Sequence, residues 1–407
     1  MTTIDFVFFN AGGGHRAAAL ALQEVIAQQR RPWRVRLVNL VDMVDPNARF
    51  QRSLGFQPED YYNLRLARGW TAGLAWELKL LQGAIRLGHR WMVQRIARHW
   101  EASPPDLIVS LVPNFNRVLH DAGRRAAPRA PFVTVMTDIA DLPPHFWIEP
   151  GIAQQVVCGS RHAAMQARRA GLPPDRVWLT SGMVLRPSFY ALPPIDRLAA
   201  RRSLGLDPSR PTGVVLFGGH GSAQMLDIAR ALDDVQLVLM CGHNERLAVA
   251  LRSLQRSAAH AVVGFTADVP HYLRLADFFV GKPGPGSLSE AAHLGLPALT
   301  FGNAATMPQE RYNLQWLRGE GLGQAVRHPG ELRSALRELL HQAAAPGTDP
   351  TDRPANRAVF EIPEILADVM TLAQARRAGG RARAAAVPSA PSACGPRPGL
   401  GALDVSR

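Results

Sequence analysis

Short apolar runs alternate along this chain with longer stretches in which apolar residues recur at helical spacing. In the first half, the short runs predict strands at residues 5–9, 34–39, 107–111, 132–136, 155–158 and 177–179. In the second half, they predict strands at residues 213–217, 236–240, 261–263, 277–280 and 298–301. Helices are expected between them. Because strands that alternate with helices form mostly parallel sheets, the pattern predicts an α/β protein.

The alternation is interrupted at residues 187–211, which are rich in proline and charge. We interpret this stretch as the connection between two doubly wound domains, residues 1–190 and residues 191–350. Ligands would bind between them, at the carboxyl ends of the strands. One more helix is expected at residues 356–377. The last part, residues 378–407, consists mainly of Ala, Arg, Gly, Pro and Ser without periodicity, which predicts a disordered basic tail.

The composition favours an anionic partner and a reducing compartment. The 407 residues include 46 Lys and Arg against 33 Asp and Glu, a net charge of +13. No apolar run reaches the roughly 20 residues that cross a bilayer, and no signal peptide opens the chain. The cysteines are widely spaced, form no metal-ligand pattern and are typical of a cytosolic protein. They are Cys158, Cys241 and Cys394.

One segment, residues 61–100, is basic and helix-forming, with Glu77 as its sole acid. Tryptophans are interleaved with its basic residues, namely Trp70, Trp76, Trp91 and Trp100. One interpretation is an interfacial segment that binds a membrane. The other is a pair of core-packing helices with a solvated basic face, because Trp is also a common core residue.

Two glycine-rich loops at opposite ends of the chain carry the candidate chemistry. Residues 280–300, VGKPGPGSLSEAAHLGLPALT, predict a strand, a loop and a helix that opens at Ser287. The unpaired N–H groups of such a helix N-terminus suit a phosphate or diphosphate. Ser287 and Glu290 also fit a Ser-x-x-Glu capping pattern, which is the structural alternative.

The other loop lies in residues 4–21, IDFVFFNAGGGHRAAALA, where a strand runs through three glycines to His15 and an Ala-rich helix. It is neither a Gly-x-Gly-x-x-Gly fingerprint nor a Walker loop, since no Gly-Lys-Ser/Thr follows. A third loop at residues 214–222, VVLFGGHGS, repeats the same order of strand, glycines and helix. The recurrence of such loops about one domain length apart suggests two doubly wound domains with a ligand cleft between them.

Five motifs together resemble the monogalactosyldiacylglycerol synthase branch of the two-domain glycosyltransferases, relatives of the peptidoglycan glycosyltransferase that makes lipid II. They are GGGHRAAA (12–19), VMTDIADLPPHFW (135–147), GMVLRPSF (182–189), GKPGPGSLSEAAHLGLP (281–297) and PQERYN (308–313). The chain departs from the family pattern at Val184, where proline is usual, and at Pro308, where glycine precedes Gln-Glu. The resemblance implies a GT-B fold, in which two Rossmann-like domains face a cleft.

By this resemblance, the second domain would bind a UDP-sugar without a metal or another cofactor, and the sequence contains no Asp-x-Asp pair for Mg²⁺ or Mn²⁺. Amides at the glycine loops would hold the diphosphate, Glu290 the ribose, and Phe265 would lie near the uracil unless it only packs on the helix that follows. The expected donor-binding residues are Gly219, Phe265, Gly284, Gly286, Ser287, Glu290, Gln309, Glu310 and Asn313.

The first domain would bind a lipid acceptor such as diacylglycerol, at Gly13, Gly14, His145 and Trp147. His15 is the expected base, since a helix N-terminus disfavours imidazolium and leaves the ring neutral. Asp138 orients or replaces it, and the residues leave that choice open. The implied reaction inverts the anomeric carbon. It would take place on the cytoplasmic side of an anionic membrane surface to which the protein is peripherally bound, and no nucleic acid is expected as a partner.

Two other functions remain possible from the sequence. One is a UDP-sugar 2-epimerase with the same two domains, which would need no lipid surface. The other is a non-catalytic basic protein that binds a membrane or nucleic acid through the old nucleotide site.

Overall fold

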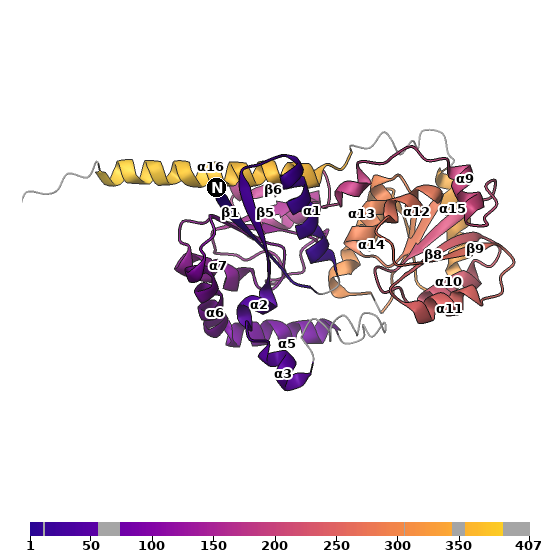
Figure 1. Cartoon of the computed structure of the whole chain (residues 1–407), viewed down its shortest axis with the longest axis horizontal. Coiled ribbons are helices and arrows are strands. Elements are labelled where there is room, and N and C mark those ends of the chain that lie inside the picture. Colours follow the sequence, from indigo (N-terminus) through magenta and orange to yellow (C-terminus); the bar gives the residue numbers. More distant parts are fainter. Residues whose placement is uncertain (11–12, 56–73, 305, 344–354, 386–407) are drawn as a thin grey trace, which may run out of the picture.

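The computed structural model of the chain describes residues 1–10, 13–55, 74–304, 306–343 and 355–385. They form two six-stranded parallel sheets with helices on both faces of each (Figure 1). The predicted α/β class with two doubly wound domains is therefore confirmed. The first sheet ends at Leu179 and the second begins at Thr212, so the predicted boundary at residue 190 falls between them.

All six strands predicted in the first half are present, with small shifts at their ends. They are β1 (Thr2–Phe8), β2 (Trp33–Asn39), β3 (Leu107–Ser110), β4 (Phe132–Val135), β5 (Gln154–Cys158) and β6 (Val177–Leu179). The sheet has the order β2-β1-β3-β4-β5-β6. Its helices include α1 (Gly14–Gln28), α2 (Leu40–Val44), α3 (Arg49–Leu54), α7 (Asn116–Ala126) and α8 (Arg161–Arg169).

The second sheet has the order β12-β11-β10-β7-β8-β9. Its strands are β7 (Thr212–Leu216), β8 (Gln236–Gly242), β9 (His260–Gly264), β10 (Phe278–Gly281), β11 (Ala298–Phe301) and β12 (Gly323–Val326). Its helices are α9 (Arg197–Ser203), α10 (Gln224–Ala231), α11 (Glu245–Arg252), α12 (Val269–Leu275), α13 (Pro285–His293), α14 (Arg311–Gly319) and α15 (Leu332–Ala343). The sequence analysis missed β12, a short edge strand that begins with glycine and pairs with β11.

The central strands are buried on both faces, which explains their continuous apolar runs. Every residue of β3, β4, β7, β10 and β11 is buried. Parallel strands covered by helices on both sides lose the alternation of apolar and polar residues. At one crossing the packing admits only glycine: a Cβ at Gly213 would lie 2.3 Å from the Phe278 ring.

The last helix, α16 (Ala358–Ala385), returns to the first domain and packs along α1 (Figure 1). Its residues Val359, Ile362, Leu366 and Val369 join the core beside β1. The helix continues to Ala385, although we expected residues beyond 377 to be disordered. Six of the eight added residues are alanine or arginine, which favour a helix, whereas Gly379 and Gly380 do not. The rest of the predicted tail, residues 386–407, lies outside the described residues.

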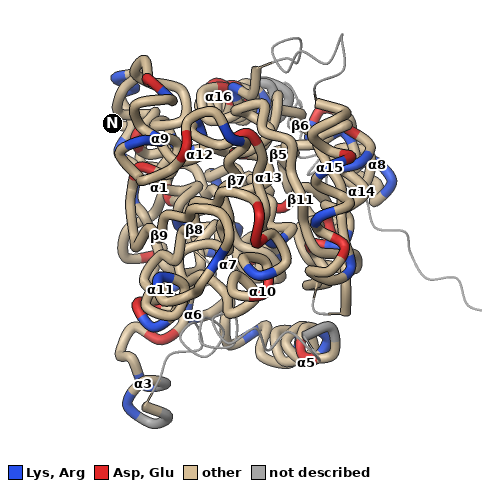
Figure 2. Tube along the Cα trace, turned by 90° about the vertical axis from the view of Figure 1, so that its right-hand side faces the viewer, with Lys and Arg blue, Asp and Glu red and all other residues tan. Residues whose placement is uncertain are grey.

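In the basic segment of residues 61–100, one helix packs in the core and another leaves apolar side chains exposed, so each interpretation fits one part. Its first part, with Trp70, lies outside the described residues, and the remainder forms α5 (Leu74–Leu87) and α6 (His89–Ala102). Helix α6 is a core helix, and its fully buried Trp100 donates a hydrogen bond to Asp5 (Nε1 to Oδ2, 2.9 Å). Helix α5 lies at the periphery of the first domain (Figures 1 and 2). It leaves apolar side chains exposed, namely Trp76, Leu80, Leu81 and Leu87.

A buried ion pair joins β1 to β2, and its removal can be tested. Asp5 is fully buried and accepts two hydrogen bonds from the Arg36 guanidinium (2.5 and 2.9 Å). Arg36→Ala leaves that carboxylate without its charge partner, so we expect unfolding free energy to fall by about 3–5 kcal/mol in chemical denaturation. The control, Arg34→Ala on the exposed side of the same strand, should change it by no more than about 0.5 kcal/mol. Equal effects of the two variants would contradict this assignment.

Candidate active site

Both sheets place a glycine loop where their strand order reverses. In the first sheet the reversal lies between β1 and β3, and in the second between β7 and β10. Ligands of doubly wound sheets bind at such points, beyond the carboxyl ends of the strands. Gly13 and Gly14 follow β1, Gly219 follows β7, and Gly284 follows β10. The strand order thus assigns each predicted loop to the end of its sheet that binds ligands.

His15 lies in the first turn of α1 and contacts the segment after β4. Gly13 caps this helix with a φ of 78°, a conformation that favours glycine. The His15 ring contacts Thr137 through a hydrogen bond (Oγ1 to Nδ1, 2.9 Å) and lies 5.9 Å from the Trp147 ring. Burial lowers the pKa of His15 to about 4, against the opposite effect of the Leu111 carbonyl. The imidazole is therefore neutral at pH 7 and able to accept a proton.

Asp138 follows Thr137 and is held by Trp147, whose indole Nε1 donates to its Oδ2 (2.8 Å). Burial raises the pKa of Asp138 to about 7, while the bond from Trp147 lowers it. Glu310 also raises this pKa and Lys282 lowers it. Glu310 and Lys282 belong to the second domain, so charges of both domains act on one carboxyl group.

The two residues expected to shape the acceptor pocket differ in exposure. Trp147 is fully buried, and it binds Asp138 with its side chain and Asp141 with its backbone N–H (2.8 Å). Trp147 therefore holds the acids in place. His145 is half-exposed, has a φ of 60° and pairs through Nδ1 with Glu149 (2.7 Å).

The donor loop runs into α13, which begins two residues earlier than expected. Gly284 is the N-cap, Pro285 is the first helical residue, and no side chain caps the helix. The capping alternative for Ser287 and Glu290 is excluded, because Gly284 is the N-cap and Pro285 occupies the first helical position, where its missing N–H costs nothing. The N–H groups of Gly286 and Ser287 lie in the first turn, where an α-helix offers no backbone acceptor.

Glu290 lies further along α13, beside an arginine from the connection between the domains. Its Oε1 is 3.9 Å from Nη2 of Arg186. Burial raises the pKa of Glu290, and Arg186 lowers it. Arg186 also donates to the carbonyl of Ala267 (3.2 Å), in the loop that carries Phe265. Because Glu290 does not cap the helix, a contact with the ribose remains the hypothesis for this residue.

The turn at the start of α14 is tied to the donor loop by two contacts. Glu310 is buried and pairs with Lys282 (Oε1 to Nζ, 3.3 Å). Asn313 is fully buried and donates to the carbonyl of Pro283 (2.7 Å). Its Oδ1 has no hydrogen-bond partner within the described part of the chain. Gln309 precedes this pair, and its Nε2 lies 3.6 Å from Sδ of Met307.

Phe265 and Gly219 both contact His243, which lies between β8 and α11. Phe265 is 62% exposed and stacks on His243, with ring centroids 3.9 Å apart and planes at 17°. The Gly219 carbonyl accepts a hydrogen bond from the His243 N–H (2.9 Å). Phe265 therefore presents one aromatic face to His243, and an apolar staple onto α12 does not describe it.

The sequence analysis left several residues of this site without a role: Thr137, Arg186, His243 and Lys282. Lys282 offered a signal, a lone lysine directly after a buried strand and before a glycine loop. Thr137 and His243 offered none, because their partners are brought to them by the folding of distant segments. Among the described residues, no group of three His, Cys, Asp or Glu side chains is placed to hold a metal ion.

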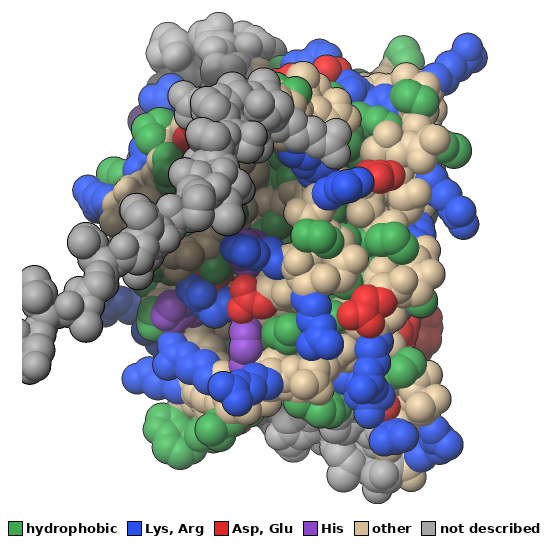
Figure 3. Space-filling model, turned by 90° about the vertical axis from the view of Figure 1, so that its left-hand side faces the viewer, with side chains coloured by type: hydrophobic (Ala, Val, Ile, Leu, Met, Phe, Trp, Pro, Cys, Tyr) green, Lys and Arg blue, Asp and Glu red, His purple; other side chains and the backbone are tan. Residues whose placement is uncertain are grey.

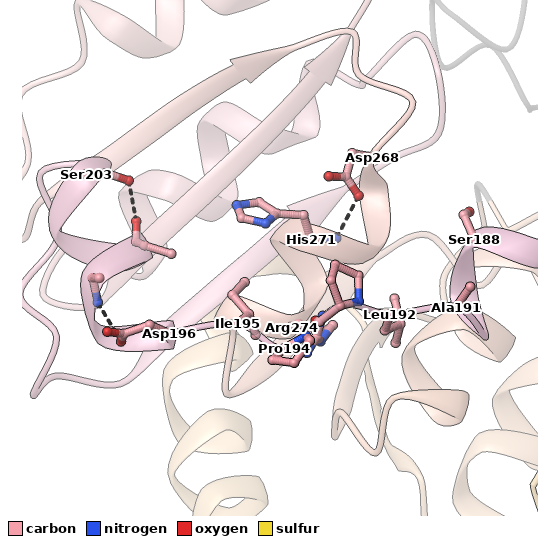
Figure 4. A pocket seen from close by; sticks show the side chains of 13 residues that line it. Ser188, Ala191, Leu192, Pro194, Ile195, Asp196, Ser203, Asp268, His271 and Arg274 are labelled. Atoms are coloured by element: carbon pink, nitrogen blue, oxygen red, sulfur yellow. Dashed lines mark hydrogen bonds between the residues drawn. The ribbon is translucent and has the colours of Figure 1, made fainter.

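A separate pocket of about 570 Å³ lies between α9 and α12 (Figure 4). Its acids already have structural roles: Asp196 caps α9 by accepting from Ala199 N (2.9 Å), and Asp268 caps α12 by accepting from His271 N (3.3 Å). Arg274 donates to the Pro193 carbonyl (2.7 Å). None of the predicted site residues lines this pocket, and we assign it no function.

Two family models match the chain, one for each domain. Residues 15–184 match the monogalactosyldiacylglycerol (MGDG) synthase family, and residues 214–365 match the glycosyltransferase family 28 C-terminal domain. The chain is therefore similar to monogalactosyldiacylglycerol synthases in its first domain and to family 28 glycosyltransferases in its second. This confirms the resemblance drawn from the five motifs.

Relatives and solved structures agree with this assignment. The chain is 26% identical to a spinach MGDG synthase over 80% of its length, and 27% identical to MGDG synthase 1 of Arabidopsis thaliana over 82%. Both alignments cover 64% of the relative. The crystal structure of MurG from Acinetobacter baumannii matches 90% of this chain and 99% of its own (TM-score 0.55, 13% identity). Glycosyltransferase SnogD from Streptomyces nogalater matches 91% and 99% (TM-score 0.54, 18% identity), so the fold is GT-B.

The shifted pKa values predict opposite effects on stability. Asp138 binds protons more tightly in the folded state, so its contribution to stability falls as pH rises from about 4 to about 7. His15 binds them less tightly, so its contribution rises between about pH 4 and pH 6.5.

Asp138→Asn should therefore make the slope of stability against pH more positive than in the unmodified chain between about pH 4 and pH 7. His15→Ala should make the slope less positive between about pH 4 and pH 6.5. Denaturant titrations at several pH values measure both slopes. The exposed acid Asp227, changed to Asn, is the control and should leave the slope as it was. If all three variants kept the original slope, the two buried titrations would not exist.

Proposed function

We propose that the chain is an inverting, metal-independent glycosyltransferase that moves a hexosyl group from a UDP-sugar to a lipid acceptor such as diacylglycerol. The observation that carries the proposal is that each domain places a glycine loop where the strand order of its sheet reverses, with His15 beside one loop and the Lys282–Glu310 pair beside the other. The pKa of Asp138 is also raised by Glu310 and lowered by Lys282, which supports a site shared by the two domains. The names of the spinach and Arabidopsis relatives support galactose as the sugar and diacylglycerol as the acceptor.

The donor half of the site supplies positive charge without an ion. The amides of Gly286 and Ser287, the dipole of α13 and the Lys282 ammonium group would stabilise the leaving diphosphate. Glu290 would accept hydrogen bonds from the ribose hydroxyls, and Gln309 and Glu310 from those of the sugar. The stacked face of Phe265 and His243 would lie near the uracil.

The acceptor half supplies the base. The acceptor oxygen attacks the anomeric carbon, the bond from that carbon to the diphosphate oxygen breaks, and UDP leaves with the electron pair. The hydroxyl proton passes to the neutral imidazole of His15, which Thr137 orients through Nδ1. One displacement inverts the anomeric configuration from α to β. Asp138 is the alternative base.

The overall proposal is tested by offering several UDP-sugars with diacylglycerol or a lipid extract, in the presence of a chelator. We expect UDP release and a β-linked glycolipid, identified by mass spectrometry and NMR. Conversion of a UDP-sugar without acceptor would favour an epimerase. Salt-sensitive binding of DNA or vesicles with no sugar transfer would favour a binding protein.

Removal of the base is expected to lower turnover and to leave the affinity for the donor unchanged. His15→Ala should reduce kcat by about 10²–10⁴-fold, the usual share of a general base, and leave UDP affinity within about twofold of the original value. Transfer assays and calorimetry measure the two quantities, and His99→Ala on α6 is the control. A pH–rate profile then separates the candidates. A rise that levels off near pH 7 would assign the role to Asp138, and undiminished turnover in the variant would remove His15 from the mechanism.

The same proposal places the protein at an anionic membrane surface through α5. Trp76 is 69% exposed and Leu80 55%, and the helix also carries Lys79 and Arg86. Gln82 on α5 donates to the Pro144 carbonyl (3.1 Å), in the turn that holds His145. This contact supports a position of the exposed helix beside the proposed acceptor. Lys and Arg side chains are also spread over the outer face of the first domain (Figure 3). No helix in the described ranges has the length and apolarity to cross a bilayer.

Trp76→Ser combined with Leu80→Ser should weaken binding to phosphatidylcholine vesicles that contain an anionic lipid, by at least about tenfold, because buried apolar area drives such binding. Vesicle flotation measures the affinity. Val249→Ser on α11, which is 62% exposed, is the matched control in the second domain. Turnover of a short-chain soluble acceptor should stay unchanged. Vesicle binding equal to that of the original chain would exclude α5 as the contact.

A further inference from the structure

Two aromatic rings stack across the junction of the domains. His162 lies in the first turn of α8, and Tyr312 lies in the first turn of α14, two helices that are neighbours in Figure 2. The ring centroids are 3.9 Å apart and the planes meet at 17°. Both side chains are half-buried. Burial lowers the pKa of His162 and raises the pKa of Tyr312, so both rings are neutral at pH 7.

On the first domain, α8 is tied to the segment that carries Asp138. Ser160, the N-cap of α8, donates its hydroxyl to the Ile139 carbonyl. Gln166 on the same helix donates to the Asp141 carbonyl (3.0 Å) and accepts from the Asp141 N–H (2.8 Å). A displacement of α8 therefore displaces the residues beside Asp138.

On the second domain, α14 is tied to the donor loop. Asn313, the neighbour of Tyr312, donates to the Pro283 carbonyl (2.7 Å), and Glu310 at the N-cap of α14 pairs with Lys282 (3.3 Å). The stack thus joins two anchored turns, one from each half of the site.

We propose that His162 and Tyr312 are positioning residues, whose stack fixes the separation between the Asp138–His15 cluster and the Lys282–Glu310 pair. Neither ring needs to touch the substrate. An aromatic pair of this geometry favours the observed arrangement of the domains over a more open one by about three- to tenfold. Catalysis requires both halves together, so the catalytic part of this inference rests on the proposed function, whereas the structural part does not.

The chain offers matched variants. His162→Ala and Tyr312→Ala remove the stack, and His162→Phe and Tyr312→Phe keep two flat rings in contact. His271 and Tyr272 form an edge-on pair within α12 (centroids 5.1 Å, planes at 87°), so His271→Ala is the control that joins no two domains. If an alanine variant fails to fold, His162→Gln or Tyr312→Leu takes its place, because each keeps side-chain volume without a stacked ring.

The first measurement uses no substrate. Spin labels at Gln94→Cys on α6 and Val249→Cys on α11 report the distance between the domains by double electron–electron resonance, with Cys394 changed to serine and the buried Cys158 and Cys241 left in place. We expect one narrow distance distribution for the original chain, the Phe variants and His271→Ala. The alanine variants should add a longer distance, and the double alanine variant should match the single ones. Unchanged distributions in both alanine variants would overturn the proposal, whatever the enzyme activity.

The second measurement separates positioning from donor binding. The alanine variants should lose about three- to tenfold in kcat/KM for transfer while UDP affinity, which depends on the second domain, stays within about twofold. The Phe variants should recover most of the loss. A loss of UDP affinity equal to the loss of kcat/KM would instead assign the pair to donor binding. If no variant and no original chain transfers sugar, the proposed function fails, and the distance distributions still decide the role of the stack.

Discussion

The site depends on Asp138, a buried acid whose pKa is raised to about 7 by burial and whose Oδ2 accepts a hydrogen bond from Trp147 Nε1 (2.8 Å). Burial and Glu310 favour the protonated form of Asp138, and Lys282 favours the charged form. The balance changes with distance, because Coulomb energy in a protein interior varies steeply at short range. The position of the second domain therefore contributes to the protonation equilibrium of Asp138, after burial and the hydrogen bond from Trp147, which are the larger causes.

Buried polar contacts within each domain fix the residues of the site. The buried Trp147 donates its indole N–H to Asp138, and Thr137 is hydrogen-bonded to the His15 ring. On the other side, Asn313 gives its amide to the donor loop. A buried polar group without a partner costs free energy, so each of these bonds restricts its segment to one position. The catalytic candidates lie on rigid turns at the ends of strands, as precise geometry requires.

The sequence predicts this fold well because both sheets are parallel and covered on both faces. Continuous apolar runs are then visible without an alignment, and β12 was missed because an edge strand that starts with Gly323 lacks such a run. His15 and Asp138 were found through their strand ends and glycines. The cap at Ser287 was misassigned because Pro285 starts the helix earlier. Contacts such as His15–Thr137 and His162–Tyr312 join segments more than 100 residues apart, and no local pattern encodes them.

The division of the basic segment between α5 and α6 connects the membrane question with the chemistry. Helix α6 fits the interpretation as a core helix, since Trp100 is buried in the first domain and donates a hydrogen bond to Asp5. That leaves α5 to carry exposed apolar side chains, which a soluble surface tolerates only in small patches unless they have a partner. Gln82 on α5 donates to the Pro144 carbonyl, two residues before the buried stretch that begins at Phe146. Under the proposed function, a lipid acceptor at α5 would lie beside the turn of Pro144 and His145, and the basic side chains of the first domain would favour an anionic bilayer.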